Sequence, residues 1–464
     1  MLSFRKVFVL DNVAQQPWHR KYYMGEAQRK KQRQQLLAKN AVLGTATAGP
    51  TLSIFTPSHD TKYLRNTYES IKAQPFDQWV ILYNNGAEPL GLSLIDPRIL
   101  EVVDTAKPTD EDATFVGRLK GIACSYCTGD IMLELDHDDM LLPTAVEKAK
   151  AAFTQDESVG FVYSNDLHVI EDLKHSAPRF NAAYGWQYRD VSFNGNVVDE
   201  CLSFKPTPAA VSLIWYAPDH FRAWRRSVYE AVGGYNRGMD VLDDQDLMCR
   251  MYLVTKFHFI NEPLYVYRFA NNTFAKHGIN QKIQTRTLEI RDIYLQKMQE
   301  AWAKNNGLRL VELGGRMNAA PGYETVDLVD ADVVCDLNEQ WPFEDNSIGV
   351  IRSFDVFEHL KNTIHTMTEL YRVLAPGGMA YIQVPSTDGR GAFCDPSHIS
   401  WFNILTFRYF TNAHFQNYLP NIPKPIRFQA IKCYTTPKDQ DEVCWVRVIL
   451  MKLGDERLPG LIEI

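Results

Sequence analysis

Long apolar runs, a disulfide framework and compositional bias are all missing from this chain of 464 residues. No stretch approaches the roughly 18–20 consecutive apolar residues that a membrane-spanning helix needs. The apolar run near the N-terminus is too short for a secretory signal. Eight cysteines do not make a disulfide framework at this length, so we expect a protein of the reducing cytoplasm. Ordinary numbers of glycine (26) and proline (23) exclude collagen-like and low-complexity chains.

The chain does have enough apolar material for several folded cores. Hydrophobic residues make up 45% and aromatic residues 12%, which excludes a largely disordered chain. Single cores stop growing near roughly 250–300 residues, so the length predicts two or three domains. Residues 1–50 hold nine basic and two acidic residues, a charge of +7; since the whole chain carries −7, the remainder carries −14. Such a basic arm could contact an anionic membrane, a nucleic acid or the acidic body.

Strand-like and helix-like segments alternate from residue 51 onwards, which predicts an α/β fold with ligands at the carboxyl edge of a sheet. A long helix is expected over 281–305, and a second α/β pattern begins after it. The expected domains are a basic arm at 1–50, an α/β domain at 51–278, a helical linker at 279–305 and a second α/β domain at 306–464.

An apolar strand at residues 131–135 runs directly into a group of acidic residues. Strand alternation places Asp136 and Asp138 on the same face. Two carboxylates so placed repel each other unless a cation lies between them, and Mg²⁺ and Mn²⁺ prefer oxygen ligands of this kind. The alternative is a solvated acidic turn that caps the helix expected after Pro143.

This acidic strand end belongs to the second of four ordered motifs within residues 51–275. They read IFTPSHDTKYLRNTYESIKAQPFDQWVILYNNG, GRLKGIACSYCTGDIMLELDHDDMLLP, VGGYNRGMDVLDDQDLMCRM and PLYVYRF. In this order they resemble the family 2 glycosyltransferases of the GT-A fold. The resemblance implies a metal-dependent, inverting enzyme that transfers a sugar from a nucleotide-sugar, with UDP as the expected nucleotide.

The resemblance also implies a role for each acidic residue. Asp138 matches the direct ligand of Mn²⁺ or Mg²⁺ in the D-x-D motif, and Asp136 matches the residue near the ribose and the metal's water shell. The metal neutralises the leaving diphosphate. Asp243 and Asp244 match the acidic pair after a Gly-Gly turn, and Asp244 is the expected general base for the acceptor hydroxyl. An acid-rich helix N-terminus is the alternative for this pair.

Nucleotide contacts are implied at the first two strand ends and at later basic positions. Pro57 and Asp60 lie where the family usually holds the base, and Asn84 stands where an Asp is usual. An amide both donates and accepts hydrogen bonds, so it can still contact a base. Arg118 matches a basic residue near the diphosphate, with Lys120 as a competitor, and Arg268 matches the late basic position. His277 is the candidate for the late metal-binding His. For His277 an ordinary surface role is the alternative.

A glycine turn after a strand opens the second α/β pattern. The segments LRLVELGGRMN, YETVDL, VVCDLNEQWPF, SFDVFEHL and ELYRVLAPGGMAYIQVPS resemble class I S-adenosylmethionine-dependent methyltransferases over about residues 306–418. The fold class implied for the whole chain is therefore a GT-A domain followed by a Rossmann-like methyltransferase domain. The implied cofactor-binding residues are Glu312, Gly314, Gly315, Asp327 and Asp336. Each of the acidic ones could instead be a strand-end turn residue.

Two features of this second pattern concern activity. Arg316 and Asn318 replace the usual alternate glycines, and Arg316 could crowd the cofactor or hold its carboxylate. The loop 389–403 could cover the acceptor, and His398 is a candidate base for an oxygen acceptor. The neighbouring pair Glu358-His359 is a familiar family element that is more often structural than catalytic.

The two resemblances predict a cytoplasmic bifunctional enzyme that adds a sugar to a glycan or glycoconjugate and methylates the product. Fusion would keep the product at a high local concentration for the second site. Two alternatives are open. The basic arm would suit an enzyme that places a sugar on a nucleic-acid base. Arg316 and Asn318 would suit a degenerate methyltransferase-like module that only binds.

Overall fold

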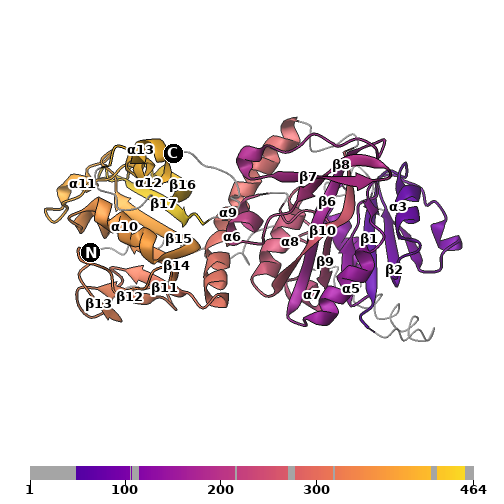
Figure 1. Cartoon of the computed structure of the whole chain (residues 1–464), viewed down its shortest axis with the longest axis horizontal. Helices are drawn as coiled ribbons and strands as arrows, with labels where there is room; N and C mark the ends of the chain where they lie inside the picture. Colours follow the sequence, from indigo (N-terminus) through magenta and orange to yellow (C-terminus); the bar gives the residue numbers. More distant parts are fainter. Residues whose placement is uncertain are drawn as a thin grey trace. The chain divides into compact units, whose positions relative to one another are not determined.

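The computed structural model describes residues 49–104, 106, 114–214, 217–269, 277–316, 319–419 and 426–454. The basic arm expected at 1–50 lies almost wholly outside this part of the chain. The chain divides into two compact units (Figure 1), with the division between Leu295 and Gln296, inside the long helix α9 (His277–Asn305).

The first unit is built on a mixed sheet in the order β3-β2-β1-β4-β9-β6-β10-β5. The neighbours β3, β2, β1 and β4 are parallel, β9 runs antiparallel to both β4 and β6, and β10 is parallel to β6. An antiparallel ribbon of β7 and β8 extends from β6. The strands are β1 (Leu52–Ser58), β2 (Gln78–Tyr83), β3 (Ile99–Val103), β4 (Ile131–Glu134), β5 (Met140–Leu141), β6 (Val159–Ile170), β7 (Gln187–Phe193), β8 (Asn196–Leu202), β9 (Arg222–Arg225) and β10 (Lys256–Phe269).

Short helices cover this sheet and connect its strands. They are α3 (Leu64–Ile71), α4 (Val116–Tyr126), α5 (Ala145–Gln155), α6 (Pro208–Leu213), α7 (Arg226–Ala231) and α8 (Asp243–Tyr252). Helix α3 buries Leu64, Thr67 and Ile71, a spacing of three and four residues that places them on one helix face. All six residues of β2 are buried, as expected of a parallel strand covered on both sides.

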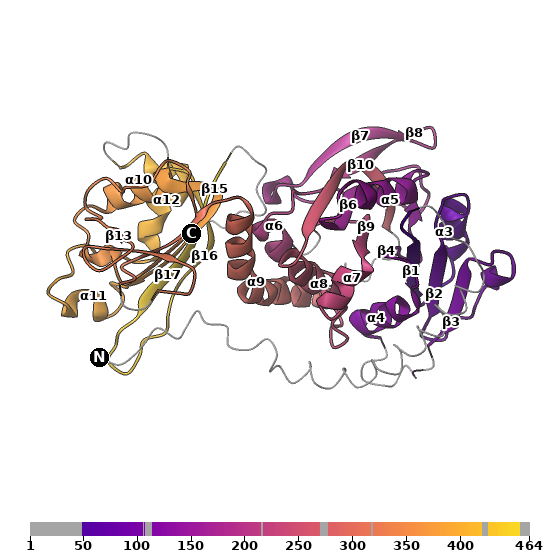
Figure 2. The same ribbon diagram turned by 90° about the horizontal axis from the view of Figure 1, so that it is seen from below.

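The second unit holds a sheet in the order β13-β12-β11-β14-β15-β17-β16. Figure 2 labels β13, β15, β16 and β17 of this sheet. The first five strands in this order are parallel, and β17 is antiparallel to β15 and β16. The strands are β11 (Arg309–Leu313), β12 (Glu324–Asp327), β13 (Val333–Val334), β14 (Ile348–Phe354), β15 (Leu374–Pro385), β16 (Phe428–Thr435) and β17 (Trp445–Lys452). The helices are α10 (Thr363–Val373), α11 (Gly391–Cys394), α12 (Arg408–Thr411) and α13 (Ala413–Gln416).

Each unit has its own apolar core, and the predicted α/β character of both halves is confirmed. All eight cysteines lie in the described part of the chain, and none of them forms a disulfide. Within the described residues, no helix combines the length and the apolar character needed to cross a bilayer. In the first unit, parallel β1, β2 and β4 all deliver their carboxyl ends to one edge of the sheet, which is where the predicted site residues gather.

Candidate active site

A cavity of about 660 Å³ lies at the carboxyl edge of the first sheet. It is lined by the ends of β1, β2 and β4, by the start of α8, by β10 and by the first turns of α9. The predicted site residues among its lining are Pro57, Asp60, Asn84, Asp136, Asp138, Asp243, Asp244 and Arg268. The tertiary structure therefore brings together residues that lie up to 211 positions apart in the sequence.

The carboxylates at the end of β4 differ in exposure: two face the cavity and one is buried. Asp136 and Asp138 lie in the turn between β4 and β5 and face the cavity with side chains 32% and 28% exposed. Asp139 is buried, and its carboxylate accepts hydrogen bonds from the Tyr265 hydroxyl (2.8 Å) and the Arg268 backbone N–H (2.8 Å). Asp139 therefore holds β10 against the turn, while Asp136 and Asp138 are available to a ligand.

The electrostatics of this turn favour a bound cation. Burial raises the pKa of Asp138, and the charge of Asp136 adds to the rise, although His137 opposes it. Burial would also raise the pKa of Asp136, but Lys120 and His220 outweigh it and hold that pKa below its ordinary value. Two adjacent carboxylates at one cavity wall, one of them destabilised by the other's charge, are a donor set that fits Mg²⁺ or Mn²⁺.

The second acidic pair opens helix α8. Leu242 precedes the helix with a φ of 61° and turns the chain so that Asp243 and Asp244 begin it at the cavity. Asp244 Oδ2 lies 2.5 Å from Nη1 of Arg222, a fully buried residue of β9. Asp243 Oδ2 lies 3.5 Å from Nζ of buried Lys120, which also pairs with Glu134. Each aspartate thus has its own buried cation.

Burial and these charged partners give the two aspartates different pKa values. Burial would raise the pKa of Asp244, but Arg222 and then Lys120 outweigh it, so that pKa lies below its ordinary value. Burial raises the pKa of Asp243 to about 7, against the pull of Lys120 and with the help of the negative charge on Asp244. Asp244 is therefore the more acidic residue of the pair, which suits a general base because a base must be ionised to accept a proton.

The positions predicted for the nucleotide divide into those that reach the cavity and those that do not. Pro57, Asp60 and buried Asn84 line it at the ends of β1 and β2. Arg118 is not among the lining residues, and its guanidinium pairs with Asp104 at 2.7 Å. Lys120, two residues further along α4, does line it. His277 is the first residue of α9, and its side chain lies outside the described part of the structure.

Arg268 is placed to meet an anion. It is buried on β10, and its guanidinium carbon lies 4.1 Å from the centre of the Tyr63 ring. Nη2 lies 3.5 Å from the sulfur of Met140, while Nε has no hydrogen-bond partner among the described residues. A buried guanidinium facing a cavity with an unused donor suits a phosphate oxygen.

Three cavity-lining histidines were not among the predicted site residues. His59 and His137 meet edge to face, with ring centroids 4.6 Å apart, and burial together with His137 lowers the pKa of His59. His220 Nε2 lies 3.8 Å from Asp136 Oδ2. His137 is the middle residue of D-x-D, so its proximity could have been predicted. His220 comes from the segment before β9, where no local sequence pattern marks it.

In the second unit, the predicted glycine turn follows β11. Gly314 has a φ of 66°, and a Cβ there would lie 2.5 Å from Cγ2 of Val356. A Cβ on Gly315 would lie 3.0 Å from Cγ of Glu312. Glu312 is buried and accepts a hydrogen bond from the Ala320 backbone N–H at 2.7 Å. Only glycine allows the backbone this conformation and closeness, which fits a turn that cradles a cofactor.

The other predicted cofactor residues lie at neighbouring strand ends. Asp327 is the last residue of β12 and accepts a hydrogen bond from the Leu328 N–H at 2.7 Å. Asp336 is exposed after β13, and the N–H and side-chain amide of Asn338 lower its pKa. Arg316 is exposed and pairs with Asp330 at 2.8 Å, so its guanidinium has a surface partner. Asn318 lies outside the described residues.

A further polar group lies near the carboxyl edge of this second sheet. Ligand atoms of Glu358, His359 and His398 all lie within 4.8 Å of one another. His398 Nδ1 lies 3.1 Å from the Ala392 carbonyl, and Nε2 lies 4.0 Å from Glu358 Oε1. Burial raises the pKa of Glu358 to about 8. The predicted base His398 thus lies beside a carboxyl group that is easily protonated.

Comparison with known proteins agrees with this division. Residues 306–382 match the family described as "Methyltransferase domain". The chain is 25% identical to hyaluronan synthase of Pasteurella multocida over 243 residues, which are 50% of this chain and 22% of that protein. It is also 25% identical to O-antigen biosynthesis protein RfbC of Myxococcus xanthus over 245 residues, 49% of this chain and 16% of that protein. The chain thus spans about a fifth of the length of the curated relatives it matches.

Partial similarity extends to solved structures. S. aureus TarS 1-349 covers 58% of this chain and 76% of its own, at 12% identity and a TM-score of 0.35. The same protein in complex with UDP-GlcNAc covers the same shares, at 11% identity and a TM-score of 0.36.

The predicted order of two α/β units, the second containing a methyltransferase domain, is confirmed. The N-terminal region is thus similar to glycosyltransferases, and residues 306–382 match a methyltransferase domain.

Proposed function

We propose that this chain transfers a sugar from a UDP-sugar to a glycan or glycoconjugate in its first unit and methylates the glycan product in its second. The observation that carries the first activity is that Asp136, Asp138, Asp244 and buried Lys120 line one cavity, with Arg222 paired to Asp244 behind it. The proposed domains are 51–278 and 306–464, joined by the helical linker 279–305. The relatives named as a hyaluronan synthase and an O-antigen biosynthesis protein support a glycan acceptor.

In the proposed reaction, Asp138 and Asp136 would hold Mn²⁺ or Mg²⁺, which supplies charge neutralisation for the leaving diphosphate. Arg268 and Lys120 place two further positive charges at the same cavity. Asp244 removes the proton of the acceptor hydroxyl as that oxygen attacks the anomeric carbon, and Arg222 keeps Asp244 ionised and oriented. Attack from the side opposite the diphosphate gives inversion.

The nucleotide base is assigned to the pocket formed by Pro57, Asp60 and Asn84. Asn84 is buried at the end of β2 and offers both an N–H and a carbonyl oxygen to a base edge. UDP is proposed because the family resemblance implies it. A location in the cytoplasm is also proposed from the family resemblance. The cysteines, none of which is paired in the structure, are consistent with it.

The second unit would bind S-adenosylmethionine at the glycine turn. Gly314 and Gly315 leave room for the cofactor, Asp327 would accept hydrogen bonds from its ribose, and Asp336 lies where the adenine is expected. The cofactor supplies an activated methyl group, so the protein's task is to position the acceptor. His398 is proposed as the base for a sugar hydroxyl. The exposed pairing of Arg316 with Asp330 removes one reason to regard this unit as degenerate.

The first experiment is a thermal-shift panel on the full chain with UDP, GDP, dTDP and CDP, each with and without Mn²⁺, and with S-adenosylhomocysteine alone. We expect a metal-dependent shift with UDP and a separate shift with S-adenosylhomocysteine. Asp138→Ala should lose the first shift and keep the second. Asp190→Ala, which removes an exposed carboxylate of β7, is the matched control and should keep both.

A labelled-donor assay then decides the reaction. Sugar transfer to a glycan, followed by methyl incorporation only into the glycosylated product, is the expected order. Methyl transfer to the acceptor without prior glycosylation, or no response to any nucleotide with Mn²⁺, would contradict the proposal.

A further inference from the structure

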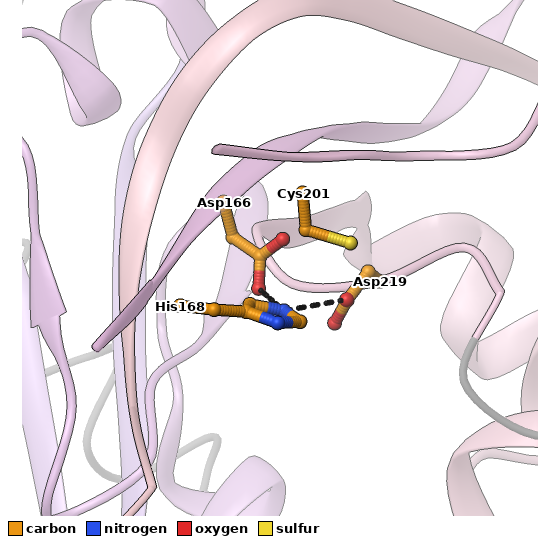
Figure 3. A group of neighbouring side chains, drawn as sticks. All are labelled: Asp166, His168, Cys201 and Asp219. Carbon is orange, nitrogen blue, oxygen red and sulfur yellow. Dashed lines mark ion pairs between the residues drawn. The ribbon is translucent and has the colours of Figure 1, made fainter. Parts of the chain in front are cut away.

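A second polar cluster lies in the first unit, buried behind the cavity lining. It consists of Asp166, His168, Cys201 and Asp219, all of them fully buried (Figure 3). Asp166 and His168 belong to β6, Cys201 to β8, and Asp219 to the segment that leads into β9. None of the four lines the cavity of about 660 Å³, so the proposed transferase chemistry does not account for them.

Strand pairing explains how three of the four meet. In the antiparallel pair of β6 and β8, Asp166 lies directly opposite Cys201. His168 is two residues further along β6, and alternation returns its side chain to the same face. Asp219 joins from a separate segment, where its backbone N–H donates to the Ser203 hydroxyl at 3.3 Å. Figure 3 shows the four side chains directed toward one another.

Two of the distances between ligand atoms are close to the edge length of a coordination tetrahedron. His168 Nε2 lies 3.1 Å from Asp166 Oδ2 and 3.5 Å from Asp219 Oδ2. Ligand atoms of all four residues lie within 4.8 Å of one another. Ligands bound at roughly 2.0–2.1 Å to one zinc ion lie about 3.3 Å apart. The imidazole nitrogen can carry only one proton, yet two carboxylate oxygens approach it, whereas a metal ion at the centre would bind all of them.

The surroundings are apolar and exclude water. The rings of Phe180, Tyr188 and Phe269 lie 5.4, 5.7 and 5.1 Å from the His168 ring. Cys201 belongs to a core cluster that also contains Trp186 and Phe204. Burial raises the pKa of the Cys201 thiol to about 12, so without a cation the thiol stays neutral. A fully buried group of one imidazole, one sulfur and two carboxylates offers only ligand types that Zn²⁺ binds.

We propose that Asp166, His168, Cys201 and Asp219 bind one tetrahedral divalent transition-metal ion of the zinc class, at a site separate from the D-x-D turn. The ion ties the β6–β8 pair to the segment before β9. The next residue in that segment is His220, which lines the cavity and lies 3.8 Å from Asp136. The metal site thereby positions one wall of the cavity without contacting the substrate.

The metal-free alternative is an imidazolium held between two carboxylates. Burial alone would lower the pKa of His168, but Asp166 and Asp219 outweigh it and raise that pKa well above its ordinary value. The two states differ in Cys201, which is a thiolate ligand in one and a neutral thiol in the other. A thiolate–metal absorption band therefore distinguishes them.

The test begins with the metal content of the full chain, purified with zinc present and then dialysed against a weak chelator. We expect about one zinc per chain. After removal of zinc, Co²⁺ should restore a near-ultraviolet thiolate-to-cobalt band and the intense visible bands of tetrahedral Co²⁺. Asp138→Ala should keep the zinc and these bands, which separates this site from the Mn²⁺ or Mg²⁺ site of the proposed transferase.

Variants identify the ligand sulfur. Cys201→Ala should lose the thiolate band, while Cys127→Ala, which removes another buried thiol of the first unit, should keep it. Failure of the wild-type chain to retain zinc, together with no thiolate band on addition of Co²⁺, would overturn the proposal. Because that result comes from the wild-type chain, it does not depend on whether Cys201→Ala folds.

Discussion

Arg222 reaches Asp244 from inside the sheet, and its charge is the main reason that the pKa of Asp244 lies below its ordinary value. Arg222 is fully buried on β9, donates from Nε to the Pro218 carbonyl at 2.9 Å, and pairs with Asp244 through Nη1. A guanidinium can hold both partners at once because its donors are fixed in one plane. The pKa of Asp244 therefore depends on the shape of the cation as well as on its charge.

Arg222→Lys keeps the charge and loses this geometry. We expect the pKa of Asp244 to rise, so that the acid limb of kcat for sugar transfer moves to higher pH by up to about one unit. The measurement is a pH profile of kcat with saturating donor. Arg225→Lys, on the same strand but bonded to backbone carbonyls, is the matched control and should leave the profile in place. An unchanged acid limb in Arg222→Lys would argue against Asp244 as the base.

Glu358 makes the stability of the second unit depend on pH. Burial raises its pKa from 4.5 to about 8, so the folded state binds more protons than the unfolded state between these values. The free energy of unfolding should then fall as pH rises from about 5 to 8, by roughly 3–4 kcal/mol. Glu358→Gln should flatten this dependence, whereas exposed Glu339→Gln should not. Denaturant unfolding at several pH values measures both.

At the scale of the element, alanine substitutions at two glycines test whether the turn after β11 requires glycine. Gly314 and Gly307 have nearly the same φ, 66° and 67°, but a Cβ on Gly307 meets nothing within 4 Å. Gly307→Ala should cost about 1 kcal/mol of stability through backbone strain alone. Gly314→Ala should cost a further ~1–3 kcal/mol, because the new methyl meets the stiff side chain of Val356.

The same two variants also predict different affinities for S-adenosylhomocysteine. Gly314→Ala should weaken S-adenosylhomocysteine binding, measured by calorimetry, while Gly307→Ala should not. In the double variant Gly314→Ala/Val356→Ala, part of the lost stability should return because the clash is removed. If Gly314→Ala binds the cofactor product as well as the wild type does, the turn after β11 is not the cofactor cradle.

At the scale of the whole molecule, two cores in one chain predict two responses to ligands. Each unit has its own sheet and apolar cluster. UDP with Mn²⁺ should raise the melting temperature of one calorimetric transition and S-adenosylhomocysteine that of the other. A ligand at 100 times its Kd adds about 2.7 kcal/mol to the unit that binds it. A single transition that both ligands raise equally would show instead that the two units unfold together.

The local sequence pattern was sufficient to predict the strand, the helix and the turn that carry several of the candidate site residues. The run of apolar residues ending in Asp136 and Asp138 predicts a strand with carboxylates at its end, because burial and alternation act over neighbouring residues. The long helix was predicted over 281–305 and spans His277–Asn305, since helical periodicity is also local. The glycine turn at Gly314 followed from the same reasoning.

Contacts between distant segments were decided only by the fold. Lys120 lines the cavity and Arg118 pairs with Asp104, because the rotation of α4 against the sheet selects which basic side chain points inward. Side chains from β6, β8 and the segment before β9 meet at His168 because strand register brings their faces together. Sequence periodicity assigns residues to strands and faces, but the pairing of one strand with another depends on the packing of the whole core.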